Sequence, residues 1–150
     1  MEVRSADLND PAVRELVRFH HADMQGMSPP EFSFALDIDK LRAPGIHVVA
    51  AYDGQELLGI GAVAVSGDEG ELKSMRTVPQ SLRSGVGTAL LGALTDIARD
   101  AGVRVLYLET GTGSEFEPAW QLYLKHGFEP SGAFGDYEES HFNRFMSKRL

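Results

Sequence analysis

The sequence contains no cysteine among its 150 residues. Disulfide bonds, a thiol nucleophile and a thiolate metal site are therefore excluded. No apolar run approaches the roughly 20 residues of a membrane-spanning helix, and the apolar segment at residues 46–52 is far too short. Charged residues occupy positions 2, 4 and 7, where a signal peptide would begin its apolar stretch. We therefore expect a cytoplasmic protein without a membrane partner.

Basic residues are also scarce, since 14 lysines and arginines stand against 22 acidic residues and give a net charge of −8. A surface of this sign repels nucleic acid, whose binding depends on neutralising phosphates. It suits a cationic substrate such as an amine. Against this acidic background, Lys73, Arg76 and Arg83 form a local concentration of positive charge, which suggests a dedicated anion site.

The length predicts one domain, residues 1–150, with a sizeable core. An Asp10-Pro11 step begins a helix that residues 26–30 interrupt. Apolar periodicity and turn residues predict further helices at residues 31–41, 85–101 and 118–126, and strands at 46–52, 56–65, 71–78 and 103–109, with one or two antiparallel strands in the tail at 137–148. This order indicates an α+β or α/β domain with a mixed sheet.

A glycine-containing loop is the most informative segment of the chain. The strand at residues 71–78 ends at Pro79, and the loop at residues 83–87 leads directly into an apolar helix pattern. A loop of this kind presents unpaired backbone N–H groups and the positive end of the helix dipole to one point in space. It therefore predicts a site for a phosphate or pyrophosphate.

The glycine pattern alone leaves alternatives. Gly85 and Gly87 could simply relieve crowding between strand and helix. A Rossmann site for a dinucleotide requires a third glycine at the position that Leu90 occupies. A P-loop requires a Gly-Lys-Ser/Thr sequence, which is absent. Nucleotide binding through a Rossmann-like site remains a rival, and it predicts that NAD or ATP is the preferred ligand.

Two segments of the chain carry recognisable motifs. The first is the strand, the Val78-Pro79 step, the loop and the helix, and the second is residues 119–128, AWQLYLKHGF. They resemble motif A and the A-x-x-L-Y-x-x-x-G-F signature of the GNAT (Gcn5-related N-acetyltransferase) superfamily. Both stand in the family's order and at about its usual separation. Four further segments resemble a subgroup of small bacterial GNAT enzymes of poorly defined substrate: residues 28–31, 41–42, 108–111 and 145–150.

The resemblance implies an α+β domain of the α/β/α GNAT fold, with a twisted, mixed and mostly antiparallel sheet flanked by helices. Acetyl-CoA would lie between the splayed motif A strand and the strand after it. The implied cofactor contacts are Met75, Arg76 and Thr77 along the pantetheine arm and Arg83, Ser84, Gly85, Val86, Gly87 and Thr88 at the pyrophosphate. One departure is that the family's first Arg/Gln position holds Leu82, with Arg83 one place later.

The implied activity is direct transfer of an acetyl group from acetyl-CoA to a primary amine of a small molecule or peptide. The matching tyrosine of the family, Tyr123 here, would act as general acid toward the departing thiolate; a core aromatic is the structural alternative. The base would be Glu71 or Glu109, and either could instead be a charge at a strand edge. Backbone N–H groups near Arg76 would stabilise charge on the thioester oxygen.

The acceptor side carries weaker signals. His20 and His21 lie on the first helix, and His20 shares its apolar face, as a packed histidine would. Glu31, Phe32, Tyr137 and the acidic residues 136, 138 and 139 are candidates to line the acceptor site, or simply a solvated run. No H-E-x-x-H or similar spacing predicts a metal site.

A non-catalytic acyl-CoA-binding or sensor domain stays open as an alternative. Dimers are common among GNAT proteins, so a homodimer is open too.

Overall fold

The computed structural model describes residues 1–27 and 38–150, and the side chains of residues 1–20 and 38–150. The strands are β1 (Glu2–Ser5), β2 (Ile46–Asp53), β3 (Glu56–Ser66), β4 (Glu69–Thr77), β5 (Val105–Gly111), β6 (Glu129–Ser131) and β7 (Asn143–Arg149). The α-helices are α1 (Pro11–Met27), α2 (Val86–Asp100) and α3 (Glu117–Lys125), with short 3-10 turns at Lys40–Arg42, Pro79–Ser81 and Ser114–Phe116. Within the described residues, no helix is long and apolar enough to cross a membrane.

The seven strands form one sheet in the order β1-β2-β3-β4-β5-β7-β6. The β4–β5 pair is parallel, and the other pairs are antiparallel. The mixed, mostly antiparallel sheet predicted from the sequence is therefore confirmed. The hairpin is confirmed as well, because Asp53 pairs with Glu56 across a turn in which Gly54 has a φ of +61°.

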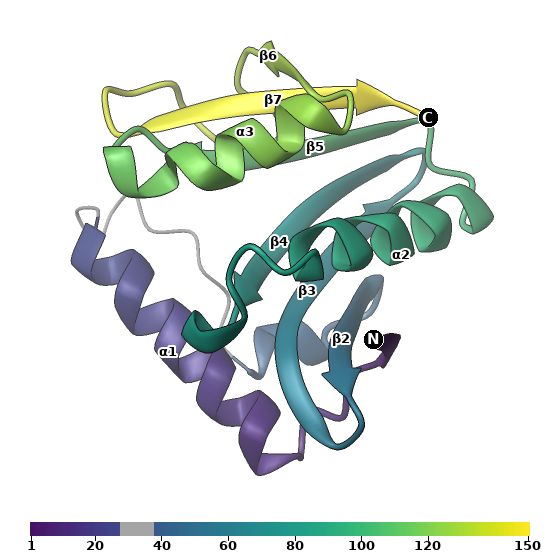
Figure 1. Cartoon of the computed structure of the whole chain (residues 1–150). Coiled ribbons are helices and arrows are strands. Elements are labelled where there is room, and N and C mark those ends of the chain that lie inside the picture. The colour runs from purple at the N-terminus through teal and green to yellow at the C-terminus, as the bar shows by residue number, and fades with distance from the viewer. Residues whose placement is uncertain (28–37) are drawn as a thin grey trace.

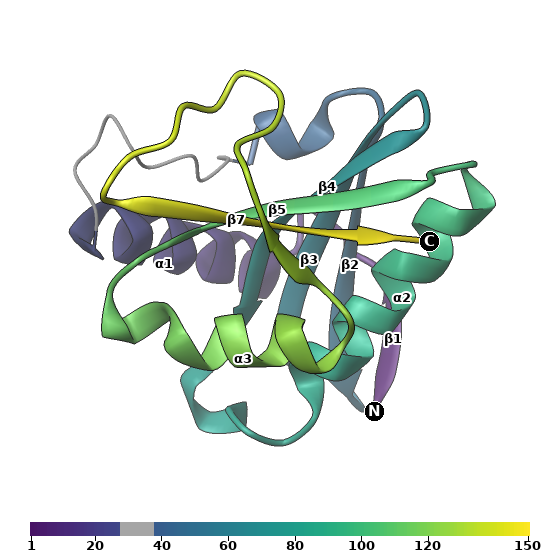
Figure 2. The same ribbon diagram turned by 90° about the horizontal axis from the view of Figure 1, so that it is seen from above.

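Helices cover both faces of this sheet (Figures 1 and 2). Alternation along β2 shows how: Val49 and Ala51 pack in the core beneath α2 and α3, whereas Ala50 and Tyr52 pack in a second core with α1. Successive strand side chains point to opposite faces, so β2 contributes to both cores. The sheet is the middle layer, and α1 lies across it from α2 and α3.

The first helix begins as the sequence predicts. The Asp10 carboxylate accepts a hydrogen bond from the backbone N–H of Ala12 at 2.9 Å, as an N-cap residue does. Val13, Leu16 and Val17 are buried on one face. The helix continues through the predicted break at Gly26 as far as Met27.

Two short edge strands, β1 and β6, were not expected from the sequence. The tail forms one strand, β7, which pairs with both β5 and β6. The predicted helix at residues 31–41 falls largely outside the described residues, and its described end includes the 3-10 turn at Lys40–Arg42.

Candidate active site

The parallel strands β4 and β5 pair along only part of their length. The paired residues run from Glu69 with Val105 to Glu71 with Tyr107, although β4 continues to Thr77 and β5 to Gly111. Beyond this point the two strands diverge (Figure 1). The edge of β4 that faces β5 is therefore left without a ladder partner there, which exposes strong hydrogen-bonding groups of the backbone.

A β-bulge lies in β4 at this opening. Lys73 pairs with Ala62 and Arg76 with Ile60, so Ser74 and Met75 together stand opposite Gly61. Ser74 has a φ of +55°, the left-handed region that a residue with a side chain seldom occupies. Its buried hydroxyl has no hydrogen-bond partner within the described residues. The bulge thus redirects β4 just past its last pair with β5.

Gly61 makes this bulge possible. A Cβ at this position would lie 2.6 Å from the sulfur of Met75 and 2.9 Å from a methyl carbon of Leu94 on α2. The absence of a side chain on β3 lets the bulged strand and the helix approach together. The glycine on β3 therefore provides the space that the bulge on β4 requires.

A cavity of about 680 Å³ occupies the opening between the strands. It is lined by β4, the end of β5, the start of α2, α3 and part of α1. All the predicted catalytic and cofactor-binding residues except Ser84 line it: Glu71, Met75, Arg76, Thr77, Arg83, Gly85, Val86, Gly87, Thr88, Glu109 and Tyr123. The acidic acceptor-site candidates at positions 136, 138 and 139 do not. The hydroxyl of Ser84 instead donates a hydrogen bond to the backbone carbonyl of Ser81.

The glycine loop closes one end of this cavity. Arg83 and Gly85 have φ values of +64° and +86°, and α2 begins at the next residue, Val86. The first-turn N–H groups of α2 therefore stand at the cavity wall with the positive end of the helix dipole, next to the exposed Arg83. Thr88 lies within hydrogen-bond distance of His126, 3.2 Å between Oγ1 and Nε2, which ties α2 to α3. This end is suited to an anion such as a pyrophosphate.

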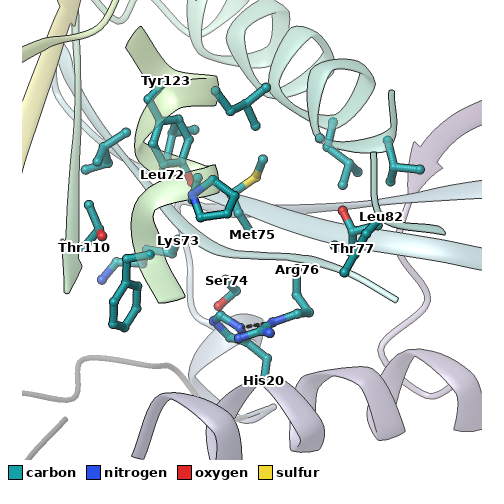
Figure 3. Close-up of a pocket in the computed structure, with 18 of the residues that line it drawn as sticks. His20, Leu72, Lys73, Ser74, Met75, Arg76, Thr77, Leu82, Thr110 and Tyr123 are labelled. Carbon is teal, nitrogen blue, oxygen red and sulfur yellow. Dashed lines mark hydrogen bonds between the residues drawn. The ribbon is translucent and has the colours of Figure 1, made fainter. Parts of the chain in front are cut away.

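Tyr123 reaches from α3 toward β4 (Figure 3). Its side chain is buried and packs edge-on against Phe128, with ring centroids 5.8 Å apart. Burial raises the pKa of the Tyr123 hydroxyl to about 12. The hydroxyl is therefore protonated at neutral pH, as a proton donor must be.

The two predicted carboxylates line the same cavity in different surroundings. Glu71 Oε2 accepts a hydrogen bond from the Tyr137 hydroxyl at 2.5 Å and lies 3.2 Å from Lys73 Nζ. Burial raises the pKa of Glu109 from its ordinary 4.5 to about 7, and the nearby charge of Glu71 adds to this rise. The side chain of Asn143 and the charge of Lys73 lower the Glu109 pKa in part. The pKa of Tyr137 is raised, first by burial and then by Glu71.

The α1 helix supplies the remaining wall. Arg76 Nε donates a hydrogen bond to His20 Nδ1 at 2.9 Å (Figure 3). The Arg76 guanidinium also stands 5.4 Å from the ring centre of Phe19. His20 is buried, as the sequence indicates, yet it also lines the cavity.

Sequence reasoning missed part of the site. Lys73 was identified as a local positive charge but not as the partner of Glu71, although the two stand two residues apart on one strand and so share a face. No sequence signal identified Asn143. Tyr137 was predicted as a lining residue and does line the cavity. Glu31 and Phe32 lie outside the described residues, and the side chain of His21 does too.

Comparison with known proteins gives the family. Residues 13–128 match the model of the acetyltransferase (GNAT) family. The chain is 44% identical over 149 residues to the uncharacterized N-acetyltransferase YedL of Escherichia coli (strain K12), covering 99% of this chain and 94% of that protein. It is 41% identical over 151 residues to the uncharacterized N-acetyltransferase YsnE of Bacillus subtilis (strain 168), covering both in full.

Solved structures agree with this assignment. A Klebsiella pneumoniae protein assigned as an acyl-CoA N-acyltransferase superposes with a TM-score of 0.82 at 26% identity, covering 99% of this chain and 97% of its own. The PaiA N-acetyltransferase of Thermoplasma acidophilum, solved in complex with coenzyme A, has the same fold, with a TM-score of 0.75 at 17% identity, covering 99% and 98%. The chain belongs to the GNAT family, as an N-acetyltransferase that takes an acyl group from an acyl-CoA and passes it to an amine.

Proposed function

We propose that the acyl donor is acetyl-CoA and that residues 1–150 act as a single domain that transfers the acetyl group directly to a primary amine of a small molecule or peptide. The main support is that a single cavity is lined by the glycine loop, by the diverging ends of β4 and β5, and by Tyr123 with Glu71 and Glu109. The absence of cysteine supports direct transfer, because no cysteinyl acyl-enzyme can form.

The donor side of the cavity fits acyl-CoA. The first turn of α2 and the exposed Arg83 would hold the pyrophosphate. The edge of β4 beyond Glu71, which β5 leaves unpaired, would pair with the amide groups of the pantetheine arm as an added strand does. The hydroxyl of Ser74, a lining residue without a hydrogen-bond partner in the described part of the chain, is a further polar group at this opening. When bound, the cofactor supplies a thioester whose carbonyl carbon accepts the amine.

The residues around the thioester would manage charge and protons. The new bond forms between the amine nitrogen and the carbonyl carbon, and the carbon–sulfur bond breaks. Backbone N–H groups near Arg76 would polarise the carbonyl oxygen. Tyr123, protonated at neutral pH, would donate its proton to the departing sulfur, and Glu71 or Glu109 would accept the proton that the amine loses.

Replacement of the Tyr123 hydroxyl tests this assignment. Tyr123→Phe keeps the buried ring against Phe128 and removes the proton donor. We expect kcat, measured by coenzyme A release over a panel of primary amines, to fall roughly ten-fold or more. The dissociation constant for acetyl-CoA should change little.

The matched control is Tyr52→Phe. Tyr52 is also buried, but it packs in the α1 core and does not line the cavity. This variant should keep the kcat of the wild type. An unchanged kcat in Tyr123→Phe would remove Tyr123 from the mechanism, and an equal fall in both variants would point to damage of the fold.

A further inference from the structure

The cavity contains more carboxylates than a single proton transfer needs, since Glu71, Glu109 and Glu115 all line it. Glu71 and Glu109 lie on adjacent strands, and both face the cavity. One oxygen of Glu71 is engaged by two donors, the Tyr137 hydroxyl and the Lys73 ammonium. Hydrogen bonds and ion pairs of this kind stabilise the charged form of a carboxylate. These two contacts hold the side chain of Glu71 in a fixed place.

Tyr137 is itself held by packing. It belongs to the segment at residues 132–142 that joins β6 to β7 (Figure 2). Its ring meets Phe134 at 5.0 Å and Phe145 of β7 at 5.8 Å, and Phe134 stacks on Tyr107 of β5 at 4.8 Å. These aromatic contacts anchor the segment on two strands. This packing places the Tyr137 hydroxyl against Glu71, although the two residues are 66 positions apart in the sequence.

We propose, on the basis of the function proposed above, that Tyr137 is a positioning residue: with Lys73 it fixes the Glu71 carboxylate beside Glu109, and Glu109 takes the proton of the acceptor amine. The nitrogen of the neutral amine forms a bond to the carbonyl carbon, and the carbon–sulfur bond breaks. The proton that the nitrogen loses passes to Glu109, and Tyr123 protonates the sulfur. Water then takes the proton from Glu109 and returns one to Tyr123, so the residues regain their starting states.

The surroundings of Glu109 support this division. The groups that face it are Glu71 and Lys73 from β4, Asn143 from β7 and Tyr137 from the connecting segment. A buried carboxyl beside a fixed like charge binds a proton more readily, and here the pKa of Glu109 rises to about 7. A base with a pKa near the working pH is the most effective at proton transfer.

A carbon-13 NMR titration of the glutamate side-chain carboxyls tests the proposal without turnover. In the wild type we expect one carboxyl that titrates near pH 7 and is lost in Glu109→Gln. Glu71→Gln should move that titration to lower pH by about half a unit or more, because the neighbouring charge is removed. Tyr137→Phe keeps the aromatic packing but frees the Glu71 carboxylate to turn away, so it should produce a smaller shift in the same direction.

Tyr107→Phe is the matched control. Tyr107 belongs to the same aromatic packing but does not line the cavity, so its variant should leave the titration in place. A titration in Tyr137→Phe that stays at the wild-type midpoint would overturn the positioning role. Equal shifts in both tyrosine variants would overturn it as well, since they would reflect packing alone.

The pH profile of kcat supplies the second measurement. Activity should fall as the pH is lowered through about 7, because Glu109 then becomes protonated. Glu109→Gln should lower kcat at pH 8 by roughly 100-fold and abolish this acid limb, whereas Glu71→Gln should retain it at lower pH. An acid limb that persists in Glu109→Gln would contradict the proposal. Coenzyme A release absent with every amine, beside the expected titration, would instead contradict the proposed function and the proton transfer with it.

Discussion

Burial of Glu109 raises its pKa, which suits the proposed proton transfer but lowers the stability of the folded protein at neutral pH. Its pKa lies near 7 in the folded protein and at 4.5 as an ordinary glutamate, so the folded state binds a proton more tightly than the unfolded state. The folded state therefore loses stability as the pH rises between about 4.5 and 7. Such a residue weakens the fold at neutral pH, as active-site groups often do.

Glu109→Gln should remove this pH dependence. The side chain keeps its size and loses its charge. Relative to the wild type, the free energy of unfolding of the variant should rise from pH 4.5 to pH 7, by about 2 kcal/mol after allowance for partial exposure. Urea unfolding at pH 5 and pH 8 measures this difference. Parallel stability curves for the two proteins would show that Glu109 is not protonated in the fold near neutral pH.

The position of a residue at the cavity could be predicted where it depends on a local motif. Tyr123 and Glu71 stand in segments whose pattern is readable, and both line the cavity. The partners of Glu71 could not be predicted in the same way. Tyr137 reaches it through tertiary packing. The same holds for Glu109, whose partner Asn143 stands at the start of β7 without any distinguishing sequence around it.

Among the elements, the glycine loop is the one whose contribution to stability and ligand binding can be tested most clearly. Gly85 precedes α2 with a φ of +86°, and Gly54 turns the β2–β3 hairpin with a φ of +61°. A Cβ at either position would meet no atom within 4 Å, so an alanine there introduces backbone strain alone. Each glycine-to-alanine variant should lose about 1 kcal/mol of stability in urea unfolding.

Of these two glycines, Gly85 lines the cavity and Gly54 does not. Calorimetric titration with coenzyme A should therefore show about ten-fold weaker binding for Gly85→Ala and unchanged binding for Gly54→Ala. Equal affinities in the two variants would show that the loop does not hold the cofactor.

Element prediction from the sequence succeeded where a pattern repeats within one segment. The long strands, the hairpin and the helices beginning near Asp10 and Gly85 all have periodic apolar residues or turn residues. The short edge strands β1 and β6 lack such a repeat; β6 spans Glu129–Ser131 and even contains a proline. They exist because β2 and β7 provide partners, and tertiary pairing outweighs local preference there. The bulge at Ser74 is similar, since its cause lies on β3 and α2.

At the scale of the whole molecule, the cavity draws its walls from residues as distant as Phe19 and Tyr137. It gathers Arg76, Arg83 and Lys125 in a chain whose net charge is −8. A local basic wall in an acidic protein favours a bound anion while the surface repels polyanions. The family assignment supports binding of an acyl-CoA, and this charge pattern agrees with our proposal that it binds in this cavity.

Thermal melting with acetyl-CoA, coenzyme A, NAD and ATP in parallel tests this conclusion most directly. A ligand at about a hundred times its dissociation constant stabilises the folded state by about 2.7 kcal/mol, which raises the melting temperature of a domain of this size by roughly 5–10 °C. We expect a shift of this order with acetyl-CoA and coenzyme A and none with NAD or ATP. A shift with NAD or ATP and none with coenzyme A would contradict the assignment of the loop and of the catalytic residues around it.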